Sequence, residues 1–505
     1  MMPARNAPAT LTLDWLLKGL VECPNAPVVE VRGLCHDSRT VRAGDLFLAL
    51  AGSRSHGMRH ASEAIAGGAC AILYDPAEGG AALAPHTSGV ACLPVAFLDQ
   101  KAGLVADRFF GEPSCHMHVI GITGTNGKTS CSHFLAHALG NDKPAAVIGT
   151  LGWGVPGALH PTAHTTPDAL EVHALLAQLW GQGIRTVAME ASSHGLIQGR
   201  LNGVRFRGGL FTNLSRDHLD YHGSMETYLE AKLRLLTWPG LEFVAFNLDD
   251  PSAADIGKRV SAGVRKIGFS LGSNRPVGGD VEVVSASGLK HDAEGISFLT
   301  RFAHSSARVA APVYGEFNAE NLLASLAVLL GTGLALEEAA QRLARVRAVP
   351  GRMERFSVPG SAAVVVDYAH TPDALDKVLS SLRRCCEGRL WVVFGCGGDR
   401  DRGKRSQMGS IAEQRADRVV VTDDNPRHED GDAIVADILT GCRSADIVVI
   451  RDRRAAIAWA IENAAPGDVL LVAGKGHETT QDVGGVKYPF RDGDVINKLL
   501  RARTE

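Results

Sequence analysis

A glycine-rich turn between an apolar strand and a helix is the feature that most constrains how this chain folds. Residues 119–131 read V-I-G-I-T-G-T-N-G-K-T-S-C, so an apolar run leads into Gly124 and Gly127 and then into K-T-S at 128–130. Glycines let successive backbone N–H groups converge on one anion, lysine supplies a positive charge, and hydroxyls can hold Mg²⁺. Ile122 stands where the usual phosphate-loop pattern has its first glycine. The turn nevertheless predicts a site for a nucleoside triphosphate.

The composition is typical of a large globular enzyme. The 505 residues are enough for about three domains, and the 45% hydrophobic and 21% charged content indicates a packed core. A net charge of −3 argues against general binding to nucleic acid or membrane surfaces. The first 20 residues lack the continuous apolar segment of a signal peptide, and no apolar run reaches 18 residues, so we expect neither a signal peptide nor a membrane span. The ten cysteines include no C-x-x-C pair, so we expect reduced thiols and a cytoplasmic protein.

Apolar strands alternate with amphipathic helices along the chain, which predicts an α/β protein of three domains. We expect an N-terminal α/β domain at 1–110. A central domain at 111–348 begins near the phosphate loop and should contain a P-loop-type, mostly parallel sheet, with hairpins over 271–313. Five apolar strands separated by helices predict a C-terminal, doubly wound, Rossmann-like sheet at 349–505.

Polar sequences follow many of these strands, at the ends where open α/β sheets bind their ligands. They are E-A-S-S-H-G (190–195), T-N-L-S-R-D-H-L-D-Y-H-G (212–223), D-Y-A-H-T-P-D (367–373), G-C-G-G-D-R-D-R-G-K-R (395–405), D-D-N-P-R (423–427) and G-K-G-H-E (474–478). Any strand end needs a polar turn, so one such sequence is weak evidence. Six of them together with the phosphate loop predict an active site.

These motifs resemble those of the Mur ligases, which are ATP-dependent amide-forming enzymes of peptidoglycan precursor synthesis. Further matches are D-S-R-x-V-x-x-G-D-L-F (37–47), T-T-P (165–167), Y-L-x-A-K (228–232), F-N-x-x-N (317–321) and G-R-M-E (351–354). The resemblance covers nearly the whole chain. It implies that the first domain binds a UDP-sugar, the central domain binds ATP, and the C-terminal domain brings the incoming amino acid.

The resemblance also implies the reaction. A substrate carboxylate is phosphorylated by ATP, and an amine then attacks the acyl phosphate to form an amide. Positive groups and metal ions must neutralise the charge on the transferring phosphoryl group. The residues implied for ATP are Gly124, Thr125, Asn126, Gly127, Lys128, Thr129, Ser130, Asn318, Arg352 and Asp367, with His370 in support.

Catalytic roles are implied for Lys128, Glu190, His218 and Lys232. By resemblance, Mg²⁺ would be held by Thr129, Ser130, Glu190, His218 and Lys232, the last as a carbamate formed with CO₂. Lysine reacts with CO₂ only as a neutral amine, which burial near metal ions would favour. An unmodified lysine on an amphipathic helix would ordinarily be solvated.

The implied substrates are small molecules, UDP-N-acetylmuramoyl-L-alanyl-D-glutamate and meso-2,6-diaminopimelate, and we expect a monomer. The residues implied for the UDP-substrate are His36, Ser38, Thr165, Thr166, Ser192, Gln198 and Arg200. Those implied for diaminopimelate are Arg400, Asp424, Asn425, Pro426, Arg427, Gly474 and Glu478. An arginine on a proline-fixed turn can bind the distal carboxylate through paired hydrogen bonds, and Glu478 suits the distal ammonium.

Two other functions remain open at this stage. Folylpolyglutamate synthetase shares the phosphate loop and the carbamate, but it would not explain D-N-P-R or the D-S-R motif of the first domain. A nucleotide-dependent switch or transport ATPase that binds a partner protein would hydrolyse ATP without an amino acid.

Overall fold

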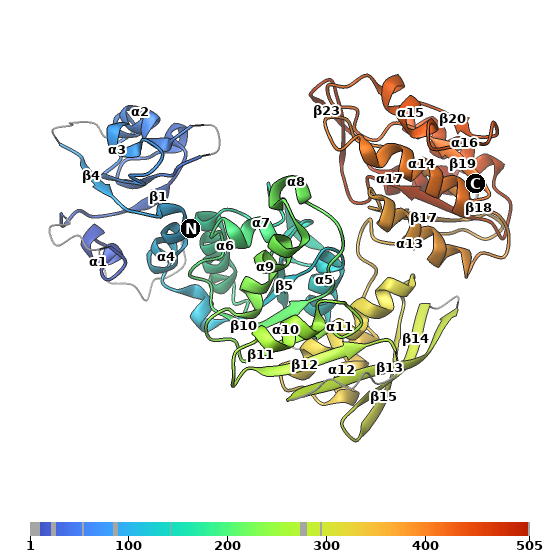
Figure 1. Cartoon of the computed structure of the whole chain (residues 1–505), viewed down its shortest axis with the longest axis horizontal. Coiled ribbons are helices and arrows are strands. Elements are labelled where there is room, and N and C mark those ends of the chain that lie inside the picture. The colour runs from blue at the N-terminus through green and yellow to red at the C-terminus, as the bar shows by residue number, and fades with distance from the viewer. Residues whose placement is uncertain are drawn as a thin grey trace. The chain divides into compact units, whose positions relative to one another are not determined.

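The computed structural model describes residues 11–21, 27–52, 55–83, 89–141, 143–272, 280–292 and 295–502 (Figure 1). The described chain divides into two compact units. The first lies within 1–286, 300–307 and 322–343, and the second within 287–299, 308–321 and 344–505. The three domain boundaries expected from the sequence stay a prediction. No helix among the described residues is long and apolar enough to span a membrane.

The N-terminal part contains a small parallel sheet in chain order. Its strands are β1 (Gly33–Cys35), β2 (Asp45–Ala49), β3 (Ala71–Tyr74) and β4 (Ala91–Pro94). The helices between and after them include α2 (Ala61–Ala66), α3 (Gly80–Leu83) and α4 (Leu98–Phe109), while α1 (Leu13–Leu17) precedes the sheet. All four residues of β3 are buried, as expected for a strand covered on both faces.

The central sheet has eleven strands in the order β15-β14-β13-β12-β11-β10-β5-β9-β6-β7-β8. Its bounds are β5 (His118–Thr123), β6 (Ala145–Gly149), β7 (Gly152–Val155), β8 (Ala158–His160), β9 (Thr186–Glu190), β10 (Phe206–Phe211), β11 (Phe243–Asn247), β12 (Arg265–Ser270), β13 (Val281–Asp292), β14 (Gly295–Phe302) and β15 (Ser305–Ala311). The strands from β13 to β6 pair in parallel, whereas β7 and β8 are antiparallel additions. This confirms the predicted mostly parallel sheet and places β13, β14 and β15 side by side in the predicted hairpin region.

Strand order explains why distant polar segments meet in the central domain. β5 lies between β9 and β10, and β6 lies beside β9. Because these strands run parallel, the segments that follow them emerge at the same edge of the sheet. The helices of this part are α5 (Lys128–Leu139), α6 (Ala169–Gly181), α7 (Ser193–Ile197), α8 (Leu219–His222), α9 (Met225–Leu236), α10 (Ala253–Arg259), α11 (Glu316–Gly331) and α12 (Leu336–Leu343).

Local sequence fixes the start of helix α9 and the face that it buries. Ser224 and Thr227 form a reciprocal capping box at its first turn. The buried side chains include Tyr228, Ala231, Lys232 and Leu235, which recur at the spacing of one helical face. Lys232 therefore occupies a core position and is 1% exposed. The general expectation that a lysine on such a helix is solvated is wrong here.

The C-terminal sheet follows the order β16-β17-β21-β18-β19-β20 and is parallel except at the β16–β17 edge. Its strands are β16 (Glu354–Phe356), β17 (Ala363–Asp367), β18 (Leu390–Phe394), β19 (Arg418–Val421), β20 (Val448–Val449) and β21 (Val469–Ala473). Five of them are the apolar strands expected from the sequence, so the predicted Rossmann-like sheet is confirmed. A hairpin of β22 (Thr480–Val483) and β23 (Val486–Pro489) follows β21.

Alternate residues of these strands enter two separate cores. Val365 and Val392 pack on one face with residues of α13 (Pro372–Arg383), α14 (Gly403–Arg415) and α15 (Gly431–Leu439). Their chain neighbours Val364 and Val393 pack on the other face with α16 (Arg453–Asn463) and α17 (Asp492–Arg501). The period of two along each strand thus produces a doubly wound sheet.

A buried ion pair joins α16 to α17. Arg453 donates through Nε and Nη2 to the two carboxylate oxygens of Asp492, both at 2.8 Å, and Nη2 also donates to the Ala473 carbonyl at 2.9 Å. Both side chains are fully buried. The pair therefore holds two helices against the end of β21, immediately before Gly474.

We expect Asp492→Ala to lower the free energy of unfolding by about 3–5 kcal/mol, because it leaves the Arg453 charge buried without its partner. Asp494→Ala, on the same helix but 65% exposed, should change it by less than about 0.5 kcal/mol. Chemical denaturation of both variants measures the difference. Equal effects would contradict a stabilising role for the buried pair.

Candidate active site

The phosphate loop is held by the segment that follows β10. Thr125 N–H donates to the Asn213 carbonyl at 2.9 Å, and Asn126 N–H donates to Asn213 Oδ1 at 2.9 Å. Ser215 N–H donates to Thr125 Oγ1 at 2.9 Å. Gly124 has φ +143°, and a Cβ there would overlap the Thr212 hydroxyl. The loop therefore needs glycine at this position for both its conformation and its close packing.

Two lysines converge on one carbonyl of this loop. Lys128 Nζ donates to the Gly124 carbonyl at 2.8 Å and to the Thr125 carbonyl at 2.9 Å. Lys232 Nζ, from α9, donates to the same Gly124 carbonyl at 2.8 Å and lies 4.2 Å from the centre of the Tyr228 ring. Burial, helped by the nearby charge of Lys128, holds the pKa of Lys232 well below its usual range. The burial of Lys232 therefore favours the neutral form of its amine.

Glu190, at the end of β9, lies beside the first turn of α5. Its carboxylate accepts hydrogen bonds from the Thr129 hydroxyl at 3.1 Å and the Thr150 hydroxyl at 3.0 Å, and also from Thr150 N–H at 2.9 Å. The side chain is 1% exposed. Gly149 allows this approach, because a Cβ there would overlap the carboxylate.

The residues proposed to hold Mg²⁺ can be tested for fit on these contacts. No group of three or more His, Cys, Asp and Glu side chains in the described ranges is arranged to hold a metal ion. Glu190 and Thr129 do present a carboxylate and a hydroxyl together, and Ser130 is buried next to Thr129 on α5. Mg²⁺ prefers oxygen ligands and retains several waters, so this small set of oxygens fits the ion.

His218 lies in a cluster of aromatic rings near Lys232. It has φ +52°, it begins α8, and its ring is 5.0 Å from that of His194 and 6.2 Å from that of Tyr228. His222 Nε2 lies 3.0 Å from Ser193 Oγ. The cluster joins the segment after β9 to the segment after β10.

Five of the residues proposed for the UDP-substrate form one network. Arg200 donates to Gln198 Oε1 at 2.9 and 2.6 Å and to the Thr166 carbonyl at 2.7 Å. Ser192 N–H donates to Thr166 Oγ1 at 3.0 Å. Thr166 in turn donates to the Glu190 carbonyl at 2.8 Å, and the Thr165 hydroxyl lies 3.0 Å from that of Thr150.

His36 and Ser38, near the first sheet, have partners of their own. His36 Nε2 lies 3.8 Å from Asp168 Oδ2, and Ser38 Oγ donates to Glu63 Oε2 at 2.5 Å. Asp168 also begins α6 by accepting the N–H groups of Leu170 and Glu171. His36 is therefore linked to the helix that follows the T-T-P segment.

The C-terminal residues proposed for ATP belong to the second compact unit. Asp367 is buried, accepts the N–H groups of Met353 and Ala369 at 2.9 and 2.8 Å, and has its pKa raised by burial. The Arg352 guanidinium lies 4.6 Å from the centre of the Tyr368 ring, and its charge opposes the rise in the pKa of Asp367. His370 Nδ1 lies 2.8 Å from the Tyr368 carbonyl.

Asn318 is 2% exposed and is held within its own segment. Its amide donates to the Tyr314 carbonyl at 2.7 Å, and its carbonyl accepts from Asn321 at 3.1 Å. These two contacts fix the orientation of the Asn318 side chain.

The residues proposed for diaminopimelate gather at the ends of β18, β19 and β21. Asn425 donates to Glu478 Oε2 at 2.8 Å. Asp424 lies against Gly474, whose φ of +110° and missing side chain allow the approach. Burial raises the pKa of Asp424. Arg427 Nη1 donates to the Gly398 carbonyl at 2.6 Å. Arg427 and Arg400 both lie close to Gly397, because a Cβ added there would be 2.9 Å from Arg427 Nη1 and 3.8 Å from Arg400 Cγ.

Several residues at these sites were missed by the sequence analysis. Lys475 is fully buried and donates to Asn425 Oδ1 at 3.0 Å and to Glu478 Oε2 at 2.8 Å, so it neutralises the carboxylate proposed for the substrate ammonium. Thr150, which donates to Glu190, was also missed. Lys475 follows β21 within G-K-G-H-E, and Thr150 directly follows β6, so their positions at strand ends could have identified both as site residues.

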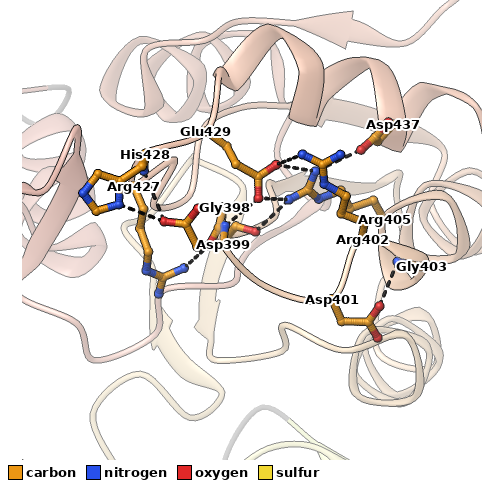
Figure 2. A network of polar contacts seen from close by, with 11 residues as sticks. Gly398, Asp399, Asp401, Arg402, Gly403, Arg405, Arg427, His428, Glu429 and Asp437 are labelled. Carbon is orange, nitrogen blue, oxygen red and sulfur yellow. Dashed lines mark hydrogen bonds and ion pairs between the residues drawn. The ribbon is translucent and has the colours of Figure 1, made fainter. Parts of the chain in front are cut away.

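A second missed group is an ion network around Arg405, shown in Figure 2. Arg405 is fully buried and pairs with Glu429 at 3.0 Å and Asp437 at 2.9 Å. Arg402 also pairs with Glu429 at 3.0 Å. The network ties the loop after β18 to the turn that carries Arg427.

Comparison with known proteins decides the family. The model of the Mur ligase middle domain matches residues 122–329, that of the Mur ligase glutamate ligase domain matches 351–476, and that of the Mur ligase family catalytic domain matches 30–91. The UDP-N-acetylmuramoyl-L-alanyl-D-glutamate–2,6-diaminopimelate ligase of Alkalilimnicola ehrlichii is 46% identical over 497 residues, which are 97% of this chain and 98% of the relative.

The chain belongs to the Mur ligase family.

Solved structures agree with this assignment. A UDP-N-acetylmuramoyl-L-alanyl-D-glutamate–2,6-diaminopimelate ligase matches with a TM-score of 0.72 and 35% identity, over 98% of this chain and 100% of that chain. A folylpolyglutamate synthase of Mycobacterium tuberculosis, complexed with ADP and AMPPCP, has a TM-score of 0.59 and 17% identity, over 75% of this chain and 92% of that chain. The second likeness shows the fold alone. This Mur ligase is an ATP-dependent ligase.

His477 gives a pH-dependent test of the C-terminal site. Burial, together with the charge of Arg352, lowers the pKa of His477 to about 4. An unfolded chain binds a proton near pH 6.5, so the folded enzyme loses stability relative to a His477→Gln variant as pH falls from about 6.5 to 4, by roughly 3 kcal/mol in total. Denaturation of both proteins at pH 8, 6 and 4 measures this difference, which should be constant above pH 7. A difference that stays constant down to pH 4 would show that His477 is not held in its neutral form.

Proposed function

We propose that this Mur ligase joins meso-2,6-diaminopimelate to the D-glutamate carboxylate of UDP-N-acetylmuramoyl-L-alanyl-D-glutamate, in the cytoplasmic synthesis of peptidoglycan precursors. The carrying observation is the full-length similarity to a ligase of that name, at 46% identity. The match over residues 30–91 supports this function over that of a folylpolyglutamate synthetase. We further propose a monomer that acts on small molecules.

The proposed reaction has two balanced steps. A carboxylate oxygen of the substrate attacks the γ-phosphorus of ATP, and ADP leaves, which gives an acyl phosphate. The amine of diaminopimelate then attacks the acyl carbon, loses a proton, and releases inorganic phosphate. Charge must be neutralised most strongly in the first step, because a carboxylate approaches a triphosphate.

Residues of the first unit suit the phosphoryl transfer. Lys128 and the N–H groups of the phosphate loop would face the transferring group. Thr129, Ser130, Glu190 and His218 would hold Mg²⁺, which when bound neutralises charge on the phosphates. The contact between Thr129 and Glu190 supports this assignment.

Lys232 is proposed to act as a carbamate. Its buried amine has a lowered pKa and donates a hydrogen bond to the Gly124 carbonyl, in the loop that would hold the phosphates. The neutral amine attacks CO₂ and loses a proton, so a side chain that is ordinarily a cation becomes a carbamate anion. That anion would add an oxygen ligand to the site occupied by Glu190 and His218.

Residues of the second unit suit nucleotide and amino-acid binding. Asn318, Arg352 and Asp367 are proposed to contact the nucleotide, with support from His370. Arg400, Asp424, Asn425, Pro426, Arg427, Gly474 and Glu478 are proposed to bind diaminopimelate. Arg427 would bind the distal carboxylate and Glu478 the distal ammonium.

One assay tests the function. The purified enzyme is given ATP, Mg²⁺ and UDP-N-acetylmuramoyl-L-alanyl-D-glutamate, with meso-diaminopimelate, L-lysine or no amino acid, and phosphate release and product mass are measured. We expect kcat/KM with L-lysine to be lower by roughly 10⁴-fold, because a site built for a carboxylate rejects the analogue that lacks it. Phosphate release without an amino acid would instead favour a switch or transport ATPase. Coupling of glutamate to a folate would favour a folylpolyglutamate synthetase.

A second test addresses the carbamate. Lys232→Ala should fold and should lose turnover by at least about 10²-fold, because it removes a proposed ligand of the Mg²⁺ that would neutralise charge on the phosphoryl group. Formate or acetate should restore part of the rate. Glu230→Ala, an exposed change on the same helix that removes a contact with Arg259, is the control. Depletion of CO₂ should slow the wild-type enzyme and leave the rate of Lys232→Ala unchanged. Full activity of Lys232→Ala would show that the carbamate has no part in the mechanism.

A further inference from the structure

Two loops at the C-terminal site meet through residues with an unfavourable backbone conformation. Asp399, in the loop after β18, has φ +52°, and Arg427, in the turn after β19, has φ +53°. A residue with a Cβ adopts this left-handed region only against steric strain with its own backbone. Such conformations persist only where neighbouring groups hold them in place.

Arg427 is held on both sides. Its N–H donates to the Asp482 carbonyl at 3.0 Å, and its carbonyl accepts from Gly484 N–H at 2.6 Å, so the β22–β23 hairpin brackets its backbone. Its guanidinium Nη1 donates to the Gly398 carbonyl at 2.6 Å (Figure 2). The direction of the guanidinium therefore depends on where the Gly398 carbonyl lies.

Glu429 fixes the loop that carries this carbonyl. Its Oε1 accepts the N–H of Asp399, the next residue after Gly398, at 2.5 Å. The Asp399 carboxylate in turn accepts from His428 N–H at 3.3 Å and lies 3.0 Å from His428 Nδ1. Gly398 packs directly on the turn, because a Cβ there would overlap the Pro426 carbonyl.

Glu429 is itself anchored by arginines. Arg405 donates to both of its carboxylate oxygens, at 3.0 and 3.1 Å, and Arg402 donates at 3.0 Å. These guanidinium groups, above all Arg405, lower the pKa of Glu429 to about 2. The anchor is therefore charged throughout the range in which a ligase would be assayed.

We propose that Glu429 is a positioning residue that aims Arg427 at the distal carboxylate of the incoming amino acid. It touches no substrate; it acts through Asp399, which sets the Gly398 carbonyl and thereby the guanidinium. This inference rests on the proposed diaminopimelate ligase function. It assigns selectivity for a dicarboxylic amino acid to an ion pair outside the binding residues themselves.

Preorganisation predicts which kinetic constant changes. If the guanidinium is held in its binding direction before the amino acid arrives, little ordering is left for the binding step. Loss of the anchor should therefore raise KM for meso-diaminopimelate while kcat at saturation changes little. The feeble use of L-lysine, which has no distal carboxylate, should not respond.

Substitutions of the two carboxylates that pair with Arg405 separate a positioning role from a stabilising one. Glu429→Gln removes the charged acceptor that faces the Asp399 loop, and Asp437→Asn removes the other carboxylate on Arg405, on α15. For both we would measure kcat and KM with meso-diaminopimelate, L-lysine and ATP, together with the denaturation midpoint. We expect Glu429→Gln to raise KM for meso-diaminopimelate by roughly 10- to 100-fold, as for a lost hydrogen bond to a charged group, with KM for ATP unchanged. Asp437→Asn should leave selectivity unchanged even if the midpoint falls.

The outcomes are distinguishable. No coupling of meso-diaminopimelate by the unmodified enzyme would overturn the proposed function and the inference with it. If that enzyme is active and Arg427→Ala loses selectivity, but Glu429→Gln and Asp437→Asn give the same KM, the positioning role is wrong. Should Glu429→Gln fail to fold, Glu429→Asp tests the same link, because its side chain is one methylene shorter and withdraws the carboxylate from the Asp399 N–H while a charged partner for the arginines remains. An unchanged KM in that variant would also overturn the inference.

Discussion

The Gly124 carbonyl, which accepts hydrogen bonds from both Lys128 and Lys232, is the point on which the candidate catalytic site depends. Two ammonium groups cannot both remain charged at one buried oxygen without strong repulsion. Burial, together with the charge of Lys128, lowers the pKa of Lys232. A helix that places a lysine on its apolar face thus brings an amine of lowered pKa to the candidate phosphate loop, and the capping box of α9 fixes where that helix begins.

The two candidate sites differ in how their charged side chains are paired. Around the phosphate loop, cationic and hydroxyl groups are gathered for an anionic ligand, with Glu190 held by neutral threonine hydroxyls. At the C-terminal site, acidic and basic side chains are already paired with one another. Lys475 occupies one oxygen of Glu478, and Arg405 occupies Glu429. Such internal pairing limits the desolvation cost of each charge and fixes its direction, so that specificity does not depend on flexible side chains.

Much of the fold and part of the site could be predicted from local sequence. The phosphate loop, the apolar strands of the C-terminal sheet and the polar segments after them are all encoded within about ten residues each, so period and turn chemistry identify them. The burial of Lys232 could not be inferred in this way, since its hydrogen-bond partner lies 108 residues away in the chain. Lys475 follows a strand, but its buried contact with Asn425 spans 50 residues, and the contact between Glu429 and Arg405 spans 24 residues. Whether a long charged side chain is solvated or buried depends on which loops the sheet topology brings beside it.

The strand order of the C-terminal sheet has a consequence for how the protein is made. β21 lies between β17 and β18, although about 75 residues separate it from β18 in the chain. During synthesis, the edges of β17 and β18 therefore stay unpaired until residue 473 has left the ribosome. Unpaired apolar strand edges are templates for association with other chains. The last strand of this sheet to be synthesised is thus the one that completes it, and until then the nascent chain exposes two apolar strand edges.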